Sequence, residues 1–270
     1  MDRKIEIMGI LNLTDDSYYA QSRCQDVLSA MKRVERMLDE GADIIDIGAC
    51  STRPGSSPVG TEEEWKRLEP VLRTIGNDFP DVRISIDTYW SEVVGRAFDL
   101  IGDFIVNDIS SGEDDPQMLP LVGRLGLTYV AMHKRGDSMT MQSMCDYHDV
   151  TAQVVSYFDH FALRAQENGI KDWILDPGFG FAKDIDQNYR LLSDLGSFRR
   201  PFGCRSESPR ILVGISRKSM IYKYLNITPE EALPATQVLH LKALQNGADI
   251  LRVHDVAEAV RTVKLYGKMQ

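Results

Sequence analysis

The sequence predicts an α/β protein built as a single (β/α)8 TIM barrel, and two observations carry this prediction. Eight short apolar runs alternate along the chain with longer stretches in which apolar residues recur every three or four positions. A strand followed by a helix, repeated eight times, is typical of a closed parallel barrel. A doubly wound open sheet is the alternative, but it usually has fewer such units and a GxGxxG turn, which is absent here.

The expected elements follow this alternation through the whole chain. Strands are expected at residues 5–11, 44–48, 82–86, 104–106, 128–132, 173–175, 210–215 and 250–253, and amphipathic helices include residues 27–40, 62–75, 150–168 and 235–245. Gly41 in EGAD and Gly247 in NGAD are placed to end a helix before the next strand. Residues 199–209, rich in arginine, serine and proline, are expected to form a surface insertion, so residues 1–270 should form one domain.

Composition narrows the class of protein. A net charge of −9 argues against general nucleic-acid binding, which requires a basic surface. No apolar stretch approaches the roughly 20 residues that span a bilayer, and the N-terminal segment is too short and too soon polar for a signal peptide. The four cysteines are scattered without CxxC spacing, which favours reduced thiols over disulfides or a zinc site. We therefore expect a cytoplasmic protein with neither nucleic-acid nor membrane partners; the cysteines are Cys24, Cys50, Cys145 and Cys204.

Almost every expected strand ends in a side chain that can make a charged or directed hydrogen bond. Active sites of this fold lie at the C-terminal ends of the strands and on the loops that follow them. In chain order these positions carry Asn12; Asp46, with Thr52, Arg53 and Pro54 after it; Asp87; Asn107 and Asp108; Met132 and His133; Asp176; Lys218 in GISRKS; and Arg252 and His254 in RVHD.

Each of these residues also has an ordinary structural explanation. An aspartate after a strand often caps the next helix, Asn107 fits a turn, Lys218 fits a solvated position, and a single histidine such as His254 is more often a core residue than a catalyst. However, Asp87, Asn107, Asp176 and Lys218 should converge on the barrel mouth. Burying so many polar groups without partners costs on the order of several kcal/mol. A flat polar ligand would supply the partners.

The motifs at these strand ends resemble those of the dihydropteroate synthase family over nearly the whole chain and in the same order. They read GILNLTDDSYY, DIGACSTRPG, SIDT, VNDIS, TMQ, LDPGFGFAK, GISRKS and RVHDV. Each motif alone is weak, but STRPG, DPGFGFAK and SRKS together are highly specific. The resemblance implies a pterin-binding transferase of folate biosynthesis that joins 6-hydroxymethyl-7,8-dihydropterin diphosphate to 4-aminobenzoate, releases pyrophosphate and is a target of sulfonamides.

The resemblance also implies which residues bind the pterin ring. A carboxylate can accept hydrogen bonds from the exocyclic amine and the adjacent ring N–H at once, and such charge-assisted bonds contribute about 1.5–3 kcal/mol each. This role falls to Asp176, with the proline and glycines after it holding a tight loop near the flat ring. Asn107 can donate and accept, Asp87 suits a further ring N–H, and Lys218 suits the carbonyl and ring nitrogen.

Binding of the diphosphate is assigned by the same resemblance to Arg252 and His254, with Asn12 as a Mg²⁺ ligand. Magnesium often takes only one or two protein oxygens together with phosphate oxygens and water. Lys218, Arg252 and His254 are the expected catalytic residues of an SN1-like substitution. An aromatic amine is unprotonated at pH 7, so no strong general base is needed; the main tasks are to stabilise the leaving charge and orient the amine.

For 4-aminobenzoate, the resemblance implies a pocket formed by Thr52, Arg53 and Pro54. Ser219, at the start of the helix after the seventh strand, is either a helix cap or part of an anion site, and the two roles are compatible. Family members are generally homodimers that pack through helices near the C-terminal end. The helix at 235–245 has apolar residues suited to this role, although ordinary barrel packing explains them equally well.

The loops depart from the family pattern at several positions. Asp15 replaces a common proline and Tyr18 a phenylalanine, while Ala49 and Cys50 replace a glycine and a glutamate; the loop after the fifth strand lacks its common proline. None of these changes touches the expected pterin or anion residues. Their expected effect is on loop closure and on affinity for 4-aminobenzoate or sulfonamides, without a change of reaction.

Three other functions are weighed against the synthase. A methyltetrahydrofolate-dependent methyltransferase shares the pterin-binding barrel, but it does not need STRPG, SRKS or the Arg252 and His254 pair, which suit a diphosphate. A non-catalytic paralogue would bind the pterin diphosphate without releasing pyrophosphate. Some other phosphate-binding barrel is disfavoured by the ordered motifs.

Overall fold

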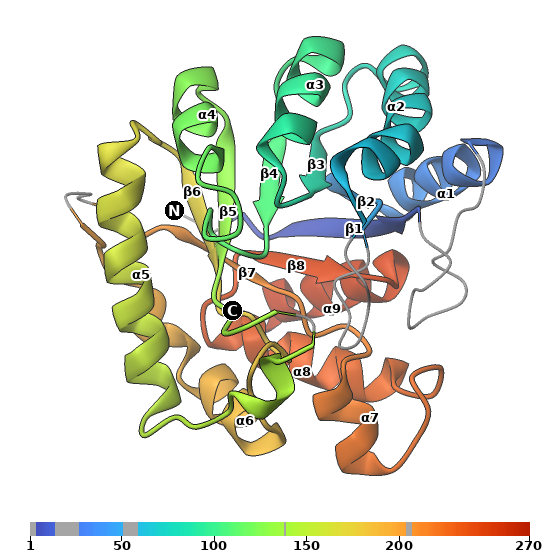
Figure 1. The fold of residues 1–270 in the computed structure, drawn as a ribbon. Helices are drawn as coiled ribbons and strands as arrows, with labels where there is room; N and C mark the ends of the chain where they lie inside the picture. The colour runs from blue at the N-terminus through green and yellow to red at the C-terminus, as the bar shows by residue number, and fades with distance from the viewer. Residues whose placement is uncertain (1–3, 14–26, 51–58, 138, 204–206) are drawn as a thin grey trace.

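The chain forms a closed barrel of parallel strands with helices around it, as the sequence predicts (Figure 1). The computed structural model describes residues 4–13, 27–50, 59–137, 139–203 and 207–270. Neighbouring strands follow the sequence order, and β8 pairs with β1 to close the barrel. The strands are β1 (Glu6–Asn12), β2 (Ile44–Gly48), β3 (Ile84–Asp87), β4 (Ile105–Asp108), β5 (Thr128–Met132), β6 (Trp173–Asp176), β7 (Arg210–Val213) and β8 (Ile250–Val253).

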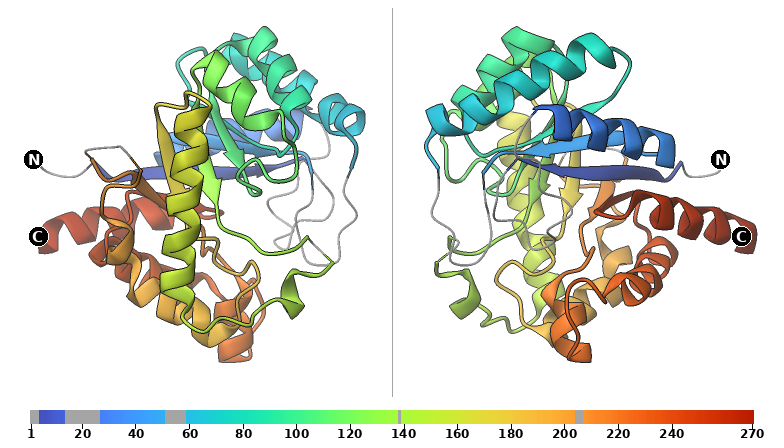
Figure 2. Two further views of the ribbon diagram at one scale, coloured as in Figure 1. Left: turned by 60° about the vertical axis from the view of Figure 1, so that its left-hand side comes forward. Right: turned by 90° about the vertical axis from the view of Figure 1, so that its right-hand side faces the viewer.

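Helices cover the outside of the barrel, and the last helix, α9, returns to the side of the molecule where β1 begins (Figure 2). The α-helices are α1 (Val27–Glu40), α2 (Thr61–Asp78), α3 (Ser91–Ile101), α4 (Met118–Leu125), α5 (Val150–Glu167), α6 (Ile185–Ser193), α7 (Ser219–Leu225), α8 (Leu233–Gln245) and α9 (Val256–Met269). Short 3₁₀ helices are η2 (Met141–Ser143) and η3 (Leu195–Phe198). In the part of the chain that the structure describes, no helix has the length and apolar character to cross a bilayer.

The element bounds expected from the sequence agree closely with those observed in the structure. The strands expected at 44–48, 128–132 and 250–253 have the observed bounds, and the helix expected at 27–40 is α1. Gly41 and Gly247 have φ angles of +100° and +111°, a conformation that glycine adopts without steric cost. The seventh strand is shorter than expected, because the chain leaves it after Val213 for the loop that carries Ser216, Arg217 and Lys218.

The apolar core has two parts, separated by the strands. Side chains alternate across each strand, so one set points into the barrel and the other toward the helices. The larger set joins the strands to the surrounding helices. The smaller set takes one residue from each of several strands: Met8, Ile44, Ile105, Val130, Ile174, Leu212 and Ile250. It closes the interior below the polar residues at the strand ends.

The described part of the segment 199–209 is anchored in the core, contrary to a purely surface insertion. Phe202 is fully buried and packs edge-on against Phe158 and Trp173, with ring centroids 6.4 Å away in each case. Arg199 also donates to both carboxylate oxygens of Asp249, at 3.1 and 2.9 Å. The polar composition of the segment concealed this single aromatic anchor.

The buried carboxylate of Glu6 links the N-terminal ends of three strands, at the end of the barrel opposite the mouth. Glu6 accepts from Arg83 Nη1 at 2.5 Å and from Arg210 Nη1 at 2.7 Å, and Lys4 Nζ lies 3.3 Å from it. Burial alone would raise the pKa of Glu6, but the hydrogen bond and charge of Arg83, with the charge of Arg210, hold it below its usual range. This network ties β1, β3 and β7 together.

The Glu6→Gln variant is expected to lose about 1–3 kcal/mol of unfolding free energy at pH 7, because two guanidinium groups lose their anion. The arginines are partly solvated, which keeps the loss below that of a fully buried pair. Since the folded-state pKa is lowered, this contribution exists above the unfolded pKa and disappears as pH falls through the folded value. Urea unfolding at pH 7 and pH 4 measures it. Glu69→Gln, at a solvent-exposed pair on α2, is the control and should change little; equal losses in the two variants would contradict the prediction.

Candidate active site

The structure brings the polar residues expected at the strand ends together at the C-terminal mouth of the barrel. Asp87 and Asn107 are paired in the register of β3 and β4, and Met132 is paired with Asp176 in the register of β5 and β6. Neither aspartate caps the helix that follows it: the N-cap of α3 is Trp90, and that of α6 is Asp184. The capping explanation therefore does not apply to Asp87 or Asp176.

Arg252 stands at the centre of the charge network. Its Nε donates to Asp46 Oδ2 at 2.6 Å, and its Nη2 donates to Asp87 Oδ2 at 2.7 Å. Asp46 also accepts from Ser85 Oγ at 2.6 Å and from Asn107 Nδ2 at 3.2 and 3.3 Å. Sequence reasoning noted Asp46 but gave it no role; the available signal was a carboxylate inside an otherwise apolar strand.

The carboxylates of the mouth are hard to ionise. Burial raises the pKa of Asp87 to about 7; Arg252 opposes the shift, while Asp46, Asp108 and Asp176 add to it. Burial also raises the pKa of Asp176, against the charge of Lys218. In turn, burial lowers the pKa of Lys218 to about 8. The mouth is thus a buried site in which desolvation favours the neutral form of each group, and the opposite charges only partly offset this effect.

The loop after β6 is shaped to hold Asp176 in place. Asp176 Oδ1 accepts from the backbone N–H of Gly178 at 2.8 Å. Gly178 has a φ of +72°, and a Cβ there would lie 1.9 Å from the backbone oxygen of His133, so only glycine fits. The tight PGFG turn therefore serves the carboxylate directly, by supplying an N–H donor and by passing close to β5.

Lys183 supports the same loop from behind, and sequence reasoning did not single it out. Its buried Nζ lies 2.9 Å from Gly178 O, 3.0 Å from Phe181 O and 3.0 Å from His133 Nδ1. Burial lowers the pKa of Lys183 to about 7 and also lowers the pKa of His133 well below its ordinary range. The only available sequence signal was its place at the end of LDPGFGFAK.

Lys218 is held at the mouth and is not a freely solvated side chain. Its Nζ donates to the backbone oxygen of Phe179 at 2.5 Å and lies 4.8 Å from the ring centroid of Phe181. The residue is the N-cap of α7, and the half-buried Ser219 is the first residue of that helix. The loops after β6 and β7 therefore meet at Lys218.

His254 follows Arg252 on the same side of β8. Its Nδ1 lies 3.0 Å from Ser216 Oγ, and Arg33 Nη2 donates to its backbone oxygen at 2.6 Å. Burial lowers the pKa of His254 to about 3, with the charges of nearby arginines adding to the shift. The imidazole is therefore neutral at pH 7 and offers a neutral nitrogen, in contrast to Arg252.

The remaining expected site residues divide into two groups. Asn12 ends β1, and a Cβ added at Gly48 would lie 3.8 Å from its Oδ1 and 3.7 Å from Asp87 Oδ2, so both oxygens lie beside Gly48 at the end of β2. Thr52, Arg53 and Pro54, expected to contact 4-aminobenzoate, lie outside the described residues. Of the cysteines, Cys50 and Cys145 are described, and neither is in a disulfide.

Asp108 has a structural role beside this site. It is fully buried and accepts from Ser110 N and Oγ, both at 2.7 Å, from Gly112 N at 2.8 Å and from Tyr129 Oη at 2.6 Å. Its acceptor positions are therefore used by the loop after β4 and by β5. Asn107, one residue earlier, points to the other side of the strand and belongs to the mouth.

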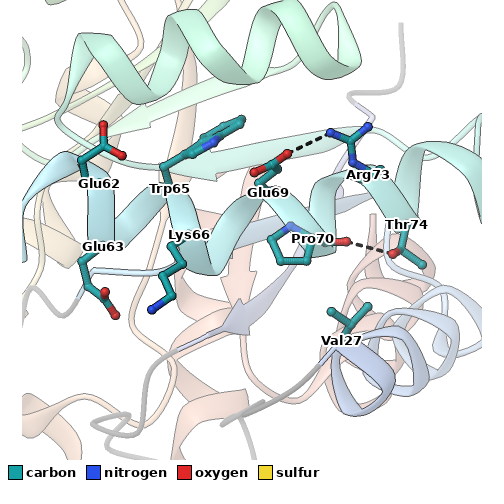
Figure 3. A pocket seen from close by; sticks show the side chains of 9 residues that line it. All are labelled: Val27, Glu62, Glu63, Trp65, Lys66, Glu69, Pro70, Arg73 and Thr74. Atoms are coloured by element: carbon teal, nitrogen blue, oxygen red, sulfur yellow. Dashed lines mark hydrogen bonds and ion pairs between the residues drawn. The ribbon is translucent and has the colours of Figure 1, made fainter.

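A groove on the outside of the helix layer has a different character (Figure 3). It runs along α2 and the beginning of α1, and its lining includes Trp65, Pro70 and Val27. Several of its polar groups are paired with one another: Arg73 pairs with Glu69 at 2.8 Å, and Thr74 donates to Pro70 O at 2.8 Å. It lacks the buried, convergent polar groups that mark a ligand site.

Glu64, in the first turn of α2, carries a buried carboxyl close to the mouth. It is 0% exposed, and neither of its oxygens makes a hydrogen bond of good geometry, although the Thr88 side chain lies close enough to affect it. Burial raises its pKa to about 7; the Thr88 side chain opposes the shift, and the charge of Asp87 adds to it. A folded-state pKa above the unfolded value means that stability is lost as pH rises from about 4.5 to 7.

The Glu64→Gln variant should therefore gain stability relative to the wild type as pH rises, by about 2–3 kcal/mol between pH 5 and pH 8. Urea unfolding at the two pH values measures the difference. Glu63→Gln is the control, because Glu63 is solvent-exposed and pairs with Arg67. A stability difference between wild type and Glu64→Gln that is the same at both pH values would show that Glu64 is ionised throughout.

Fold and site together define an enzyme of the (β/α)8 barrel class with a buried polar mouth, and comparisons with known proteins agree. The profile of the pterin-binding enzyme family matches residues 8–254. Dihydropteroate synthase of Escherichia coli K12 is 40% identical over 96% of this chain and 89% of its own length. A Yersinia pestis dihydropteroate synthase in a sulfonamide drug complex superposes with a TM-score of 0.91 at 34% identity, over 100% of this chain and 95% of that one.

A third relative adds a product complex. Burkholderia cenocepacia dihydropteroate synthase, solved with 7,8-dihydropteroate, superposes with a TM-score of 0.87 at 35% identity, covering 100% of this chain and 92% of that one. The chain therefore belongs to the pterin-binding enzyme family, and its relatives there are dihydropteroate synthases.

Proposed function

We propose that this chain uses the polar cluster at its barrel mouth to carry out the dihydropteroate synthase reaction. In that reaction the methylene carbon of 6-hydroxymethyl-7,8-dihydropterin diphosphate loses its bond to the diphosphate oxygen and gains a bond to the amine nitrogen of 4-aminobenzoate. The amine loses one proton, and pyrophosphate leaves. The observation that carries the proposal is the convergence of Asp176, Asn107, Asp87, Lys218 and Arg252 at one barrel mouth.

In this proposal the pterin ring binds through hydrogen bonds to the carboxylates of the barrel mouth. Asp176 uses one oxygen for Gly178 N, so its second oxygen and remaining lone pairs can accept from an amine and a ring N–H. Asn107 and Asp87 contact the opposite edge of the ring. Lys218, already poised to donate to a carbonyl oxygen, donates to the ring carbonyl and nitrogen side.

The leaving diphosphate is taken by Arg252 and His254. Arg252 supplies a fixed planar charge, and the neutral His254 supplies a hydrogen bond without a second charge. Together with Lys218 these residues stabilise the negative charge that develops as the C–O bond breaks in an SN1-like step. The cationic carbon is stabilised by the electron-rich dihydropterin, so no protein nucleophile is required.

The second substrate, 4-aminobenzoate, is assigned to Thr52, Arg53, Pro54 and Ser219 by resemblance to the family. Half-buried Ser219 is the first residue of α7 and directly follows Lys218 of the proposed pterin site. Arg53 would pair with the carboxylate of the substrate. The amine would then face the methylene carbon of the pterin.

A Mg²⁺ ion bound through Asn12 is part of this proposal. Within the described ranges, no group of three or more His, Cys, Asp or Glu side chains is arranged to hold a metal. Asn12 ends β1 at the barrel mouth, and Mg²⁺ needs only one protein oxygen together with phosphate oxygens and water, so an asparagine at this place is compatible with the ion. When bound, the ion would neutralise charge on the diphosphate.

A homodimer and a cytoplasmic location complete the proposal. Val238 on α8 is 67% exposed, and Leu265 and Met269 on α9 are also exposed, although α8 packs on the barrel through buried His240 and Leu244. In this proposal the exposed apolar side chains of α8 and α9 are the surface that the second subunit would cover. Sedimentation equilibrium of the wild type and of Val238→Asp tests the dimer, which predicts a shift toward monomer in the variant.

The decisive experiment follows both products of the reaction. Purified protein is incubated with the pterin diphosphate, 4-aminobenzoate and Mg²⁺, and pyrophosphate and dihydropteroate are measured. Equal amounts of the two products support the proposal. Binding of the pterin diphosphate without turnover would favour the non-catalytic paralogue, and the altered positions Asp15 and Cys50 would be examined first. Methyl transfer from methyltetrahydrofolate without synthase activity would favour the methyltransferase.

A further inference from the structure

Asp46 is a fully buried carboxylate in β2 that touches several elements of the site at once. It accepts from Ser85 on β3, from Asn107 on β4 and from Arg252 on β8, with the closest contacts at 2.6 Å. Asp46 is 0% exposed, so its carboxylate interacts with protein groups and not with solvent. Two of these three partners belong to the proposed substrate site.

The carboxylate of Asp46 determines whether the oxygen or the nitrogen of the Asn107 side-chain amide faces it. A carboxylate only accepts hydrogen bonds, so Asn107 must turn its Nδ2 toward Asp46, at 3.2 and 3.3 Å from the two oxygens. The flipped amide would set a carbonyl oxygen against the carboxylate without water to separate them. Asn107 Oδ1 therefore stays available as an acceptor at the mouth.

Asp46 also fixes the plane of Arg252. Asp46 Oδ2 lies 2.6 Å from both Nε and Nη2, and Asp87 Oδ2 lies 2.7 Å from Nη2, so contacts to two separate carboxylates define the orientation of the rigid guanidinium. Nη1 is the guanidinium nitrogen that takes no part in these contacts. Its direction is thus set before any anion arrives, which reduces the ordering needed on binding.

We propose that Asp46 is a positioning residue that sets the donor and acceptor pattern of the site by orienting Asn107 and Arg252. This inference rests on the proposed function, because it assumes that these two side chains meet the pterin diphosphate. Asp46 itself touches no substrate. It acts by holding Asn107 as an acceptor for a ligand N–H and Arg252 as a donor to the anionic group.

A double-mutant cycle with 6-hydroxymethyl-7,8-dihydropterin as the probe tests the inference. Measured by calorimetry, Asp46→Asn should weaken binding about 10- to 30-fold when Asn107 is present and less than about 3-fold in an Asn107→Ala background. The same fold loss in both backgrounds would overturn the proposal. Failure of the wild type to bind this probe would instead count against the proposed function, so the two failures are distinguishable.

Asp249→Asn is the matched control. Asp249 is also buried and accepts from an arginine and from a backbone N–H, but it lies at the opposite end of β8. It should lower stability without changing affinity for the probe. Should Asp46→Asn not fold, ¹⁵N-labelled wild type replaces it: the Nδ2 protons of Asn107, identified by their absence in Asn107→Ala, should exchange more slowly than those of a free amide. Unprotected Nδ2 protons would overturn the proposal.

Discussion

Replacing Asp176 with asparagine is expected to reduce turnover with subsaturating pterin diphosphate by about 10²- to 10³-fold, because two charge-assisted hydrogen bonds are weakened together. Asparagine offers one acceptor oxygen and turns an N–H group toward the other donor. The loop itself should persist, since a side-chain oxygen remains for Gly178 N. Initial rates of pyrophosphate release and calorimetric affinity for the pterin diphosphate measure the effect.

The pH dependence of binding separates the charge of Asp176 from its shape. Burial raises the pKa of Asp176, so in the wild type the affinity for the pterin should fall as pH decreases through that value, while Asp176→Asn should lack this part of the dependence. Asp108→Asn is the control, because Asp108 is equally buried but bonded to protein groups alone. A similar loss of affinity in both variants would show general damage to the barrel mouth rather than a pterin anchor.

The fold was predictable because its signal is local and repeated. Apolar strand runs and amphipathic helices alternate, and each error at a boundary leaves the order of elements intact. The strand at 44–48 and the helix at 27–40 were placed at their observed ends. Phe202 was missed for the opposite reason: its burial depends on Phe158 and Trp173, which are far away in the sequence.

The site was predictable only in part. Position at a strand end singled out Asp87, Asn107 and Asp176, because the fold alone says where such ends meet. It gave no reason to choose Asp46, which lies one layer deeper and acts through other side chains. Lys183 and Glu64 were missed because their importance lies in burial and pKa, which sequence position does not reveal.

The second large effect is expected at Arg252. Arg252→Met should reduce pyrophosphate release by about 10²- to 10⁴-fold, because the charge that develops on the leaving group loses its fixed donor. The same change leaves Asp46 and Asp87 buried without their cation, which should cost about 3–5 kcal/mol of stability. Activity and stability would thus fall together, so the single variant cannot tell a catalytic role from a structural one.

A double variant separates these two roles. Arg252 lowers the pKa of Asp87, which is already about 7, so in Arg252→Met this pKa rises further and the stability of the variant should fall as pH increases through neutrality. Arg252→Met with Asp87→Asn removes one of the two stranded charges and should recover part of the lost stability, measured by urea unfolding at pH 8. Pyrophosphate release should not recover, because the donor to the diphosphate is still absent. Recovery of turnover alongside stability would mean that Arg252 acts by neutralising carboxylates and not by binding the leaving group.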